Sequence, residues 1–500
     1  MIRAYSVEAV RAAEAELMAT LHEGELMLRA ARGLADLVRS RAAHRQASAV
    51  AVLVGPGNNG GDGLFAAVDL AGDHQVSILY VGEEIHPDGH AAARAAHLPL
   101  IGLERSNVDL PTEALEVLDG AGIVVDALTG IGGRAGLSGA MRALVEHIDN
   151  DSYVIAVDLP SGVDPSGHRI GAGAVFADET VTFGVAKPVH LLPVTEPAVG
   201  ALTVIDIGLD VPGVAAVELM EHDDVAGMWP RPGAVDHKYS RGVVGIIAGS
   251  ADFPGAAVLA TVAAVESGAG LVRYLGPPAA TAHVVAAAPE AVPAAGRVQA
   301  WVLGPGIDAQ ASASGGESGD GKSEVSQADR ICETMESGDA CVLDAGALTF
   351  FDYPRSAPTL LTPHAGELAR LLTAWPGHEE VTRAQVEAAP VAWAHAAAHV
   401  TGATVLLKGA STVIASPEQN LPIRIAASAP AWLATAGAGD VLAGLCGTLL
   451  AAGLSPRDAG SLAALVHGVA AHDANPGGPV RASTVARAIP GTVARLLSRR

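Results

Sequence analysis

Short apolar runs that alternate with helical segments constrain the fold of this chain more than any other feature of its sequence. In the first half, helical character is expected at 7–39 and 64–70, and β-strands are expected at 49–54, 75–80, 122–126 and 153–158. In the second half, helices are expected at 256–268 and 441–452, and strands at 243–248, 301–303, 340–343 and 404–407. Such alternation predicts parallel sheets covered by helices on both faces, so the fold class is α/β.

The chain divides into two predicted α/β domains. Its 500 residues are too many for one ordinary domain. A stretch rich in Pro and Gly at 210–233 is a predicted linker, which gives domains at 1–215 and 220–500. Residues 311–327 are rich in Ser, Gly, Asp and Glu, and they predict a flexible surface insertion in the second domain.

Composition excludes several classes of function. The formal net charge of −23 disfavours binding to nucleic acid and to anionic membranes. Three scattered cysteines, without a CxxC pair, argue against a disulfide framework and against structural zinc. The N-terminus lacks the apolar core of a signal peptide, and no stretch is long and apolar enough to span a bilayer. We therefore expect a cytoplasmic protein that binds small molecules, and we expect it to form a homo-oligomer.

A glycine-rich loop at 55–63 (GPGNNGGDG) follows the strand 49–54 and opens a helix. Glycines allow the backbone to approach a ligand closely, so the amides at the helix start can bind a phosphate. The loop is neither GxGxxG nor a Walker loop, and Asp62 within it would repel a phosphate. Its side chains therefore suggest a cation or a sugar hydroxyl in addition to a phosphate.

Two further strand ends of the first half carry oxygen ligands. Asp126 ends one strand and is followed by a glycine-rich segment, 130–136; Asp158 ends another and is followed by Ser161. Ligands of open α/β sheets bind at the carboxyl ends of the strands, so these groups are expected to meet. Asp158 is a candidate acid or base, and the oxygens of Asn59, Asp126 and Ser161 suit a hard monovalent cation.

The second half carries a different set of motifs. Residues 436–440 (AGAGD) start an apolar helix, where amides can stabilise a developing negative charge and Asp440 is a candidate acid or base. After the strand 404–407, a polar run suits nucleotide phosphates; it comprises Lys408, Gly409, Ala410, Ser411 and Thr412. His364 lies at another strand end.

The motifs of the first half, which include DLPSGVD and TFGVAKP, resemble the NAD(P)H-hydrate epimerase family over about residues 1–215. The resemblance implies a Rossmann-like three-layer domain, catalysis by Asp158, and K⁺ bound by Asn59, Asp126 and Ser161. It also implies substrate contacts at Asp158 and at Asn58, Asn59, Gly60, Gly61, Asp62, Gly130, Ile131, Gly132, Gly133, Arg134, Ala135 and Gly136. Lys187 could approach a phosphate, although a solvated surface lysine is the commoner case.

The second half resembles the ADP- or ATP-dependent NAD(P)H-hydrate dehydratase family over about 220–500. This resemblance implies a ribokinase-like domain, catalysis by Asp440, and ADP or ATP as co-substrate with Mg²⁺. It implies substrate contacts at Ala256, Gly306, His364 and Asp440, and nucleotide contacts along 408–412 and at Gly439. The segment 343–348 (LDAGAL) lacks a second Asp expected in relatives.

Together the two resemblances imply repair of hydrated NADH and NADPH. The first domain would interconvert the R and S forms, and the second would dehydrate the S form at the expense of ADP or ATP. Two alternatives remain: a ribokinase-like small-molecule kinase fused to a nucleotide-binding module, and a first half that binds ligands or a protein without catalysis.

Overall fold

The computed structural model describes residues 1–307, 326–375 and 379–498. These residues form two compact units. The N-terminal unit is Arg3–Val217, and the C-terminal unit comprises Met1–Ile2 and Glu218–Arg500. Of the insertion predicted at 311–327, only Ser326 and Gln327 lie within the described residues, where they cap and begin helix α13 (Gln327–Glu336). Across the described ranges, no helix has the length and apolar character needed to cross a membrane.

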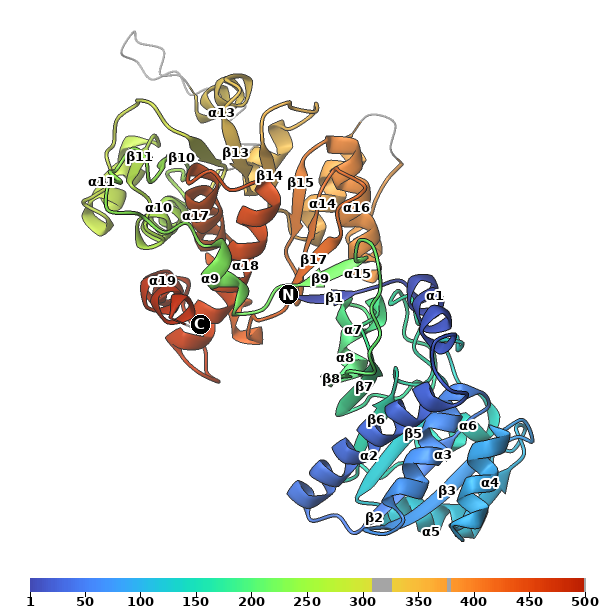
Figure 1. The fold of residues 1–500 in the computed structure, drawn as a ribbon. Helices are drawn as coiled ribbons and strands as arrows, with labels where there is room; N and C mark the ends of the chain where they lie inside the picture. The colour runs from blue at the N-terminus through green and yellow to red at the C-terminus, as the bar shows by residue number, and fades with distance from the viewer. Residues whose placement is uncertain (308–325, 376–378, 499–500) are drawn as a thin grey trace. The chain divides into compact units, whose positions relative to one another are not determined.

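The N-terminal unit is built on a seven-stranded sheet. Its strands are β2 (Ala49–Val54), β3 (Gln75–Val81), β4 (Leu100–Leu103), β5 (Ile123–Ala127), β6 (Tyr153–Val157), β7 (Glu179–Phe183) and β8 (Ala201–Ile205). Their order is β4-β3-β2-β5-β6-β7-β8, and every neighbouring pair is parallel (Figure 1). The helices are α1 (Val7–Met18), α2 (Glu25–Arg45), α3 (Asn58–Leu70), α4 (Pro87–Ala95), α5 (Thr112–Gly120), α6 (Gly139–Glu146), α7 (Pro188–Leu191) and α8 (Glu196–Val199).

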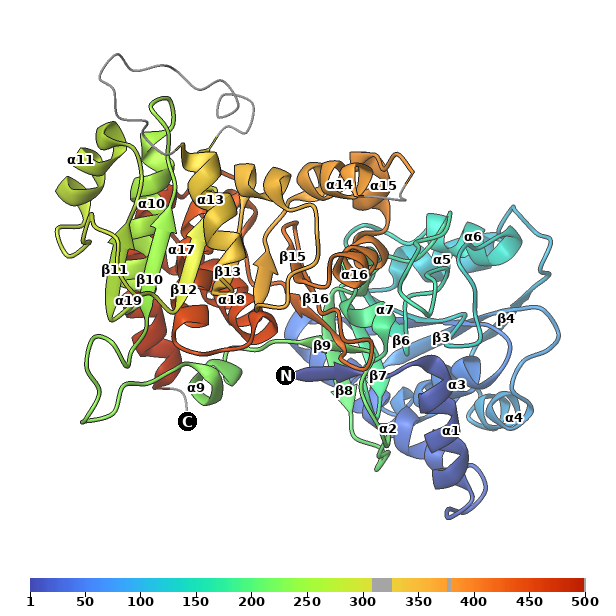
Figure 2. The ribbon, with the colours of Figure 1, turned by 90° about the horizontal axis from the view of Figure 1, so that it is seen from above.

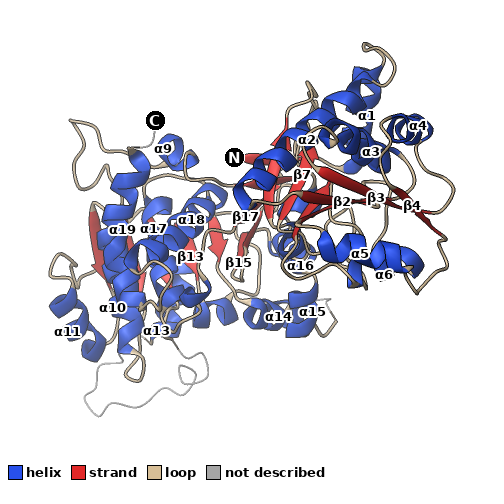
Figure 3. Ribbon diagram, turned by 90° about the horizontal axis from the view of Figure 1, so that it is seen from below, coloured by secondary structure: helices blue, strands red, loops and turns tan. Residues whose placement is uncertain are grey.

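Helices cover both faces of this sheet, as the near-continuous apolar strands require. Val52 and Val54 of β2 belong to a buried cluster with residues of α2 and α3. Ala51 and Leu53, which point to the other face, belong to a cluster with residues of α5 and α6. Figure 3 shows these helix pairs on opposite sides of the strands. The expected three-layer α/β architecture is therefore present.

The single helix expected at 7–39 is wrong, because two helices occupy this stretch. Helix α1 ends at Met18, and α2 begins at Glu25 after a turn. Gly24 has a φ of +76°, which a side-chain-bearing residue rarely adopts and which interrupts the helical path. The periodicity of the apolar residues continues across the turn, so it did not reveal the break.

The C-terminal unit contains a larger sheet. Its strands are β1 (Ile2–Ala4), β9 (Val217–Leu219), β10 (Val243–Ile247), β11 (Leu271–Tyr274), β12 (Ala300–Leu303), β13 (Ala340–Leu343), β14 (Thr359–Leu361), β15 (Thr404–Leu407), β16 (Thr412–Ala415) and β17 (Ile423–Ala426). The division between the units falls within β1, after Ile2, and within β9, after Val217. The strands are ordered β1-β9-β17-β16-β15-β14-β13-β12-β10-β11. The strands from β15 to β11 pair in parallel, whereas β16 pairs antiparallel with both of its neighbours, β15 and β17.

Apolar helices form the core of this unit. The remaining helices are α9 (Asp224–Met228), α10 (Pro254–Glu266), α11 (Pro278–Ala287), α14 (Ala365–Ala374), α15 (Arg383–Ala388), α16 (Pro390–Thr401), α17 (Ala438–Ala451), α18 (Pro456–Ala474) and α19 (Ala482–Leu497), with two 3₁₀ turns at Ala345–Phe350 and Ala431–Leu433. Helices α10, α17, α18 and α19 share one buried cluster with β10 and β12. Most of α17 is buried, because small residues such as Gly444 and Gly447 let it pack closely against α10 and β12.

The linker expected at 210–233 is only partly correct. Strand β9 and helix α9 lie within it, and the amide of Met220 donates to the carbonyl of Ile425 in β17. The N-terminal amine of Met1 forms ion pairs with Asp224, at 2.8 Å, and with Glu221, at 3.2 Å. Met1, Ile2 and the part of this stretch from Glu218 onward therefore belong to the C-terminal unit.

Candidate active sites

The glycine-rich loop of the N-terminal unit is itself the first turn of a helix. Helix α3 begins at Asn58, six residues earlier than expected, after Gly57 at a φ of +86°. The free amides of this first turn are available to an anion. A Cβ added to Gly55 would lie 1.8 Å from the carbonyl oxygen of Leu128. The ends of β2 and β5 can approach this closely only because residue 55 is glycine.

Replacing Gly55 with Ala is therefore expected to lower the free energy of unfolding of the N-terminal unit by about 1–3 kcal/mol, the usual cost of overpacking. Chemical denaturation of the purified chain measures this change. Gly72→Ala is the matched control, since a Cβ at Gly72 meets no atom within 4 Å. Equal stability of the two variants would contradict the close approach.

A cavity of about 610 Å³ opens at the carboxyl ends of the strands in this unit. Predicted residues that line it are Asn58, Asn59, Asp62, Gly130, Ile131, Gly132, Gly133 and Asp158. Gly60, Gly61, Arg134, Ala135 and Gly136 are not among the lining residues. The sequence did not indicate that α1 also lines the cavity, through Arg11, Glu14 and Met18. The geometry brings the three strand ends together as expected.

Asp158 is held in one orientation by four neighbours. Its Oδ1 accepts from Lys187 Nζ at 2.6 Å and from Thr182 Oγ1 at 3.2 Å, and its Oδ2 accepts from the Ile131 amide at 3.2 Å. His190 Nε2 lies 2.7 Å from the backbone carbonyl oxygen of Asp158. The φ of Asp158, +65°, is an uncommon conformation that these contacts maintain.

Burial raises the pKa of Asp158, but the ion pair with Lys187 outweighs burial and leaves the pKa below its ordinary value. The side chain is thus a carboxylate.

Lys187 differs from both expectations for it. Its side chain is 1% exposed, so its ammonium group is neither solvated nor accessible to a phosphate group of a ligand. Its Nζ donates to Asp158 and, at 2.8 Å, to Thr182 Oγ1. Burial of an ammonium group is tolerated only with a partner of opposite charge, and Asp158 is that partner.

Of the three predicted cation ligands, Asn59 lines the cavity, whereas Asp126 and Ser161 are fully buried behind it. Asp126 is fully buried, and its Oδ1 accepts from Ser161 Oγ at 2.7 Å while its Oδ2 accepts from the Ser161 amide at 2.8 Å. The side chain of Asn59 approaches the glycine-rich segment that follows β5, since a Cβ on Gly130 would lie 3.0 Å from Asn59 Oδ1. Asn59 Nδ2 and Thr129 Oγ1 are buried without hydrogen-bond partners among the described residues. Burial raises the pKa of Asp126 to about 6, and the hydrogen bonds from Ser161 oppose it only in part.

The second candidate site lies in the C-terminal unit, at the sheet that contains β10, β12, β13 and β15, with β14 between the last two (Figure 2). Gly437, with a φ of +87°, caps α17, and Asp440 lies in the first turn of that helix. A Cβ on the neighbouring Gly439 would lie 3.3 Å from Lys408 Nζ. Burial, and then the negative charge of Asp344, raise the pKa of Asp440 to about 7, although Lys408 lowers it. Asp440 is therefore poised to exchange a proton near neutral pH.

Lys408 connects two strand ends of this site. It follows β15, and its Nζ donates at 2.8 Å to Asp344, which follows β13; Glu367 lies 3.8 Å away. Asp344 also accepts from Thr362 Oγ1 at 2.8 Å. Burial lowers the pKa of Lys408, but the two carboxylates outweigh burial and raise it, so the side chain is a cation.

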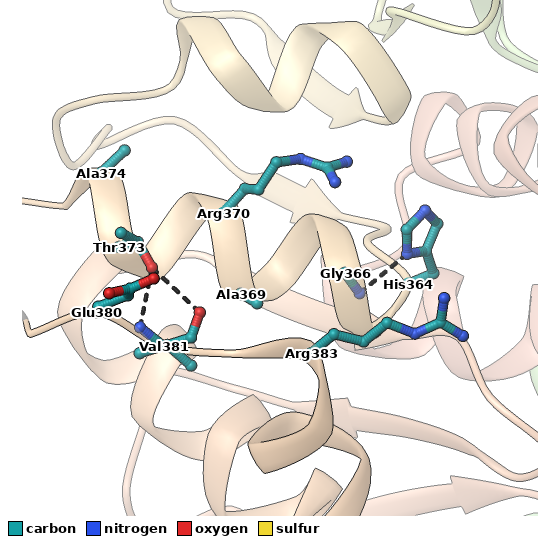
Figure 4. Close-up of a pocket in the computed structure, with 9 residues that line it drawn as sticks. All are labelled: His364, Gly366, Ala369, Arg370, Thr373, Ala374, Glu380, Val381 and Arg383. Carbon is teal, nitrogen blue, oxygen red and sulfur yellow. Dashed lines mark hydrogen bonds between the residues drawn. The ribbon is translucent and has the colours of Figure 1, made fainter.

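His364 caps helix α14. Its Nδ1 accepts from the amides of Gly366, at 3.0 Å, and Glu367, at 3.2 Å. Figure 4 shows the ring at the end of a surface cavity of about 500 Å³ that Arg370 and Arg383 also line. Burial lowers the pKa of His364, Lys408 lowers it further, and Glu367 opposes both. The ring is thus neutral at physiological pH, and its Nε2 lies 3.5 Å from Glu367 Oε1.

The other predicted residues of this half occupy turns at strand ends or helix starts. Gly409, Ala410 and Ser411 join β15 to β16, and Thr412 begins β16. Gly306 follows β12 and Ala256 lies in the first turn of α10; a Cβ on Gly306 would lie 2.5 Å from the Cβ of Ala256. These two residues are therefore in contact with each other.

Comparisons with known proteins assign the chain. Residues 244–490 match the family described as NAD(P)H-hydrate dehydratase, and residues 23–189 match that described as YjeF-related protein N-terminus. A bifunctional NAD(P)H-hydrate repair enzyme Nnr of Mycobacterium leprae (strain TN) is 39% identical over 485 residues, which cover 93% of each chain. The protein of the same name in Mycobacterium tuberculosis (strain ATCC 25618 / H37Rv) is 40% identical over 474 residues, covering 91% of this chain and 90% of that one.

The chain belongs to the family of bifunctional NAD(P)H-hydrate repair enzymes. The resemblance inferred from the motifs of both halves is thereby confirmed. A solved structure of the ADP/ATP-dependent NAD(P)H-hydrate dehydratase from Bacillus subtilis, co-crystallised with ATP/Mg²⁺, is 25% identical, covers 55% of this chain and 97% of that chain, and gives a TM-score of 0.48.

In this member of the repair-enzyme family, several charged residues at the sites were missed from the sequence. Asp344 and Glu367 surround Lys408, and Glu14 faces the first cavity. Asp344 directly follows β13. Ligands of α/β sheets bind at the carboxyl ends of the strands, so the position of Asp344 could have been predicted from the sequence. Glu14 has no such signal, because it lies in an ordinary amphipathic helix.

Proposed function

We propose that this chain carries out two consecutive steps in the repair of hydrated NADH and NADPH. The N-terminal unit exchanges the R and S forms, and the C-terminal unit dehydrates the S form with a nucleotide as co-substrate. The observation that carries the proposal is that this one chain has both sites. The N-terminal unit has a cavity lined by the ionised Asp158. The C-terminal unit has a helix start at which Asp440 lies beside Lys408. The kinase and non-catalytic alternatives are not retained, because the similarity to bifunctional NAD(P)H-hydrate repair enzymes extends over both halves of the chain.

In the first site, the dinucleotide would bind along α3 and the segment 130–136. The free amides at the start of α3 suit a phosphate of the substrate. Asn58, Asn59 and Asp62 offer hydrogen-bonding groups to its sugar or ring. Asp158, an anion aimed into the cavity, would stabilise positive charge on the nicotinamide ring.

We propose K⁺ as the cation of the first site, held by Asn59, Asp126 and Ser161. The residues fit it. Among the described residues, the hydrogen-bond donors to the fully buried carboxylate of Asp126 include no cationic side chain. The Ser161 hydroxyl contacts this carboxylate and lies 3.4 Å from the carbonyl oxygen of Thr129. Bound there, the ion would supply charge that offsets the burial of Asp126. Asn59 and Ser161 would thereby also fix the segment 130–133 that lines the cavity.

In the second site, the hydroxyl oxygen of the hydrate would attack the terminal phosphorus of ADP or ATP. Asp440 would accept the hydroxyl proton as the new O–P bond forms and the P–O bond to the rest of the nucleotide breaks, which releases AMP from ADP or ADP from ATP. The amides at the start of α17 stabilise the developing charge. Phosphate then leaves with the electron pair of the C–O bond, and the neighbouring carbon releases a proton, which restores the ring double bond.

The nucleotide would lie against residues 408–412 and Gly439, where Lys408 supplies the positive charge. Ala256, Gly306 and His364 would contact the hydrate. We expect Mg²⁺ to arrive with the nucleotide phosphates, because within the described ranges no cluster of three His, Cys, Asp or Glu side chains is arranged to hold a metal. A cytoplasmic location, a homo-oligomeric state and the absence of nucleic-acid binding stay predictions.

The dehydration step is tested by its products. The chain is supplied with pure S hydrate and with ADP or ATP, and both restored NADH and free phosphate are measured. Equal amounts of the two products are expected. A stable phosphate ester without restored NADH would instead support kinase chemistry.

The dehydration rate is expected to rise with pH through about 7, the pKa of Asp440. The reason is that a base acts only when it is ionised, and a raised pKa moves ionisation to higher pH. The pH dependence of kcat/KM with saturating nucleotide measures this. A rate that is already maximal at pH 5, where Asp440 is protonated, would contradict the role of Asp440 as the base.

A further inference from the structure

Three carboxyl side chains face the cavity of the N-terminal unit, and they have unequal surroundings. Glu14 comes from α1, Asp62 from α3, and Asp158 from the end of β6. Asp158 alone receives the ammonium group of Lys187, at 2.6 Å. No described residue donates a hydrogen bond to the carboxyl of Asp62, and no described cation pairs with it. The cavity therefore contains one carboxylate that is paired with a cation, Asp158, and two carboxyl groups without such a partner among the described residues, Glu14 and Asp62.

Burial also raises the pKa of Glu14, and the pKa values of Asp62 and Asp158 shift in opposite directions. Burial, then the negative charges of Asp158 and Glu14, hold the pKa of Asp62 well above its ordinary value, and Lys187 opposes them only weakly. The pKa of Asp158 lies below its ordinary value because Lys187 is in direct contact with it. Two neighbouring carboxyls whose pKa values are pushed apart serve as an acid and an anion, respectively.

The reaction proposed for this site needs one group of each kind. Inversion at the hydroxyl-bearing carbon, which adjoins the ring nitrogen, proceeds if the hydroxyl gains a proton and leaves as water. The C–O bond breaks, and the nitrogen lone pair forms a C=N bond with positive charge. Water then adds from the opposite face, its oxygen forms the new C–O bond, and it releases one proton, so the acid is restored and the atoms balance.

We propose that Asp62 is the general acid of the first site, that Asp158 is the anion that stabilises the cationic ring, and that Lys187 positions Asp158. This inference rests on the proposed epimerase function. It follows from the unpartnered carboxyl of Asp62 at the cavity wall and from the buried Lys187–Asp158 contact.

The test uses the full-length chain with Asp62→Asn, which keeps the shape of the side chain but cannot donate an acidic proton. Exchange between R and S hydrate, followed by chromatography with the uncatalysed rate subtracted, is expected to slow by about 100-fold or more, as for loss of a general acid. Asp62→Glu is expected to recover part of the rate. Asp88→Asn, an exposed residue of α4, is the matched control and should act like the unmodified chain.

Two further readouts separate an acid from a merely structural residue. The exchange rate of the unmodified chain should fall as pH rises through the pKa of Asp62, because only the protonated form donates; the residual rate of Asp62→Asn should lack this step. In water enriched in heavy oxygen, each catalysed inversion should install one solvent oxygen in the hydroxyl group.

The outcomes are distinguishable from failure of the proposed function. If the unmodified chain does not speed exchange, the epimerase proposal itself fails. If it does, and Asp62→Asn retains more than about one third of the rate or the hydroxyl oxygen is retained, the role of Asp62 is overturned. An unchanged melting transition of the N-terminal unit of Asp62→Asn shows that this unit is folded, and unchanged dehydration of S hydrate shows that the C-terminal unit is intact.

Discussion

Replacing Asp440 with Asn is expected to lower the dehydration rate by about 10²–10⁴-fold, the usual contribution of a general base. Asn has nearly the same shape but cannot accept the hydroxyl proton. The first turn of α17 and its amides stay in place, because Gly437, not Asp440, caps the helix. Binding of the nucleotide is therefore expected to change little, and the loss should appear in kcat.

Restoration of NADH from S hydrate measures the effect, and exchange of the R and S forms serves as an internal control. That exchange should be unchanged, since Asp440 belongs to the C-terminal unit. Glu333→Gln, which removes an exposed charge from α13, is the matched control. If Asp440→Asn dehydrates at more than about one tenth of the original rate, another group is the base.

Replacing Lys187 with Met is expected to lower the free energy of unfolding of the N-terminal unit by about 3–5 kcal/mol, because it leaves the buried Asp158 charge without a partner. For a unit of this size, a loss of about 3 kcal/mol corresponds to a melting temperature lower by about 6–12 °C. Methionine fills a similar volume, so the loss reports on charge and not on a cavity. Calorimetry of the full chain measures it.

A second variant separates the charge effect from simple misfolding. Lys187→Met combined with Asp158→Asn removes both charges, and it is expected to recover part of the lost stability. Lys238→Met, at an exposed lysine, is the control and should leave the melting temperature within about 1 °C. Unchanged stability of Lys187→Met would contradict the ion pair.

The pair also gives the N-terminal unit a pH dependence of defined sign. The folded pKa of Asp158 is depressed, so its contribution to stability is present above the unfolded pKa and is lost as pH falls through the folded value. Lys187→Met should weaken that loss at acid pH.

The positions of the site residues were predictable where a local pattern marks them. An apolar run followed by glycine places β2 and α3, and Asp126, Asp158 and Asp440 were found because each lies at a strand end or helix start. These features depend on neighbouring residues in the sequence. Local propensity and the parallel topology therefore suffice to bring such groups to one edge of a sheet.

The partners of these residues were not predictable, because they come from distant positions. Lys187 lies 29 residues from Asp158 and Lys408 lies 64 residues from Asp344, and neither lysine carries a local sign of burial. The expected solvated Lys187 was wrong for this reason. The break in the helix at Gly24 was missed because apolar periodicity continues on both sides of it.

One measurement tests the central claim, namely that one chain contains both repair steps. Hydrated NADH is prepared as a mixture of R and S forms, and absorbance follows the return of NADH after addition of the chain with ADP or ATP. Complete recovery with nucleotide, and none without it, is the predicted result. Recovery that stalls at the share of the S form would contradict an active first site, and no recovery with either nucleotide would contradict the dehydratase.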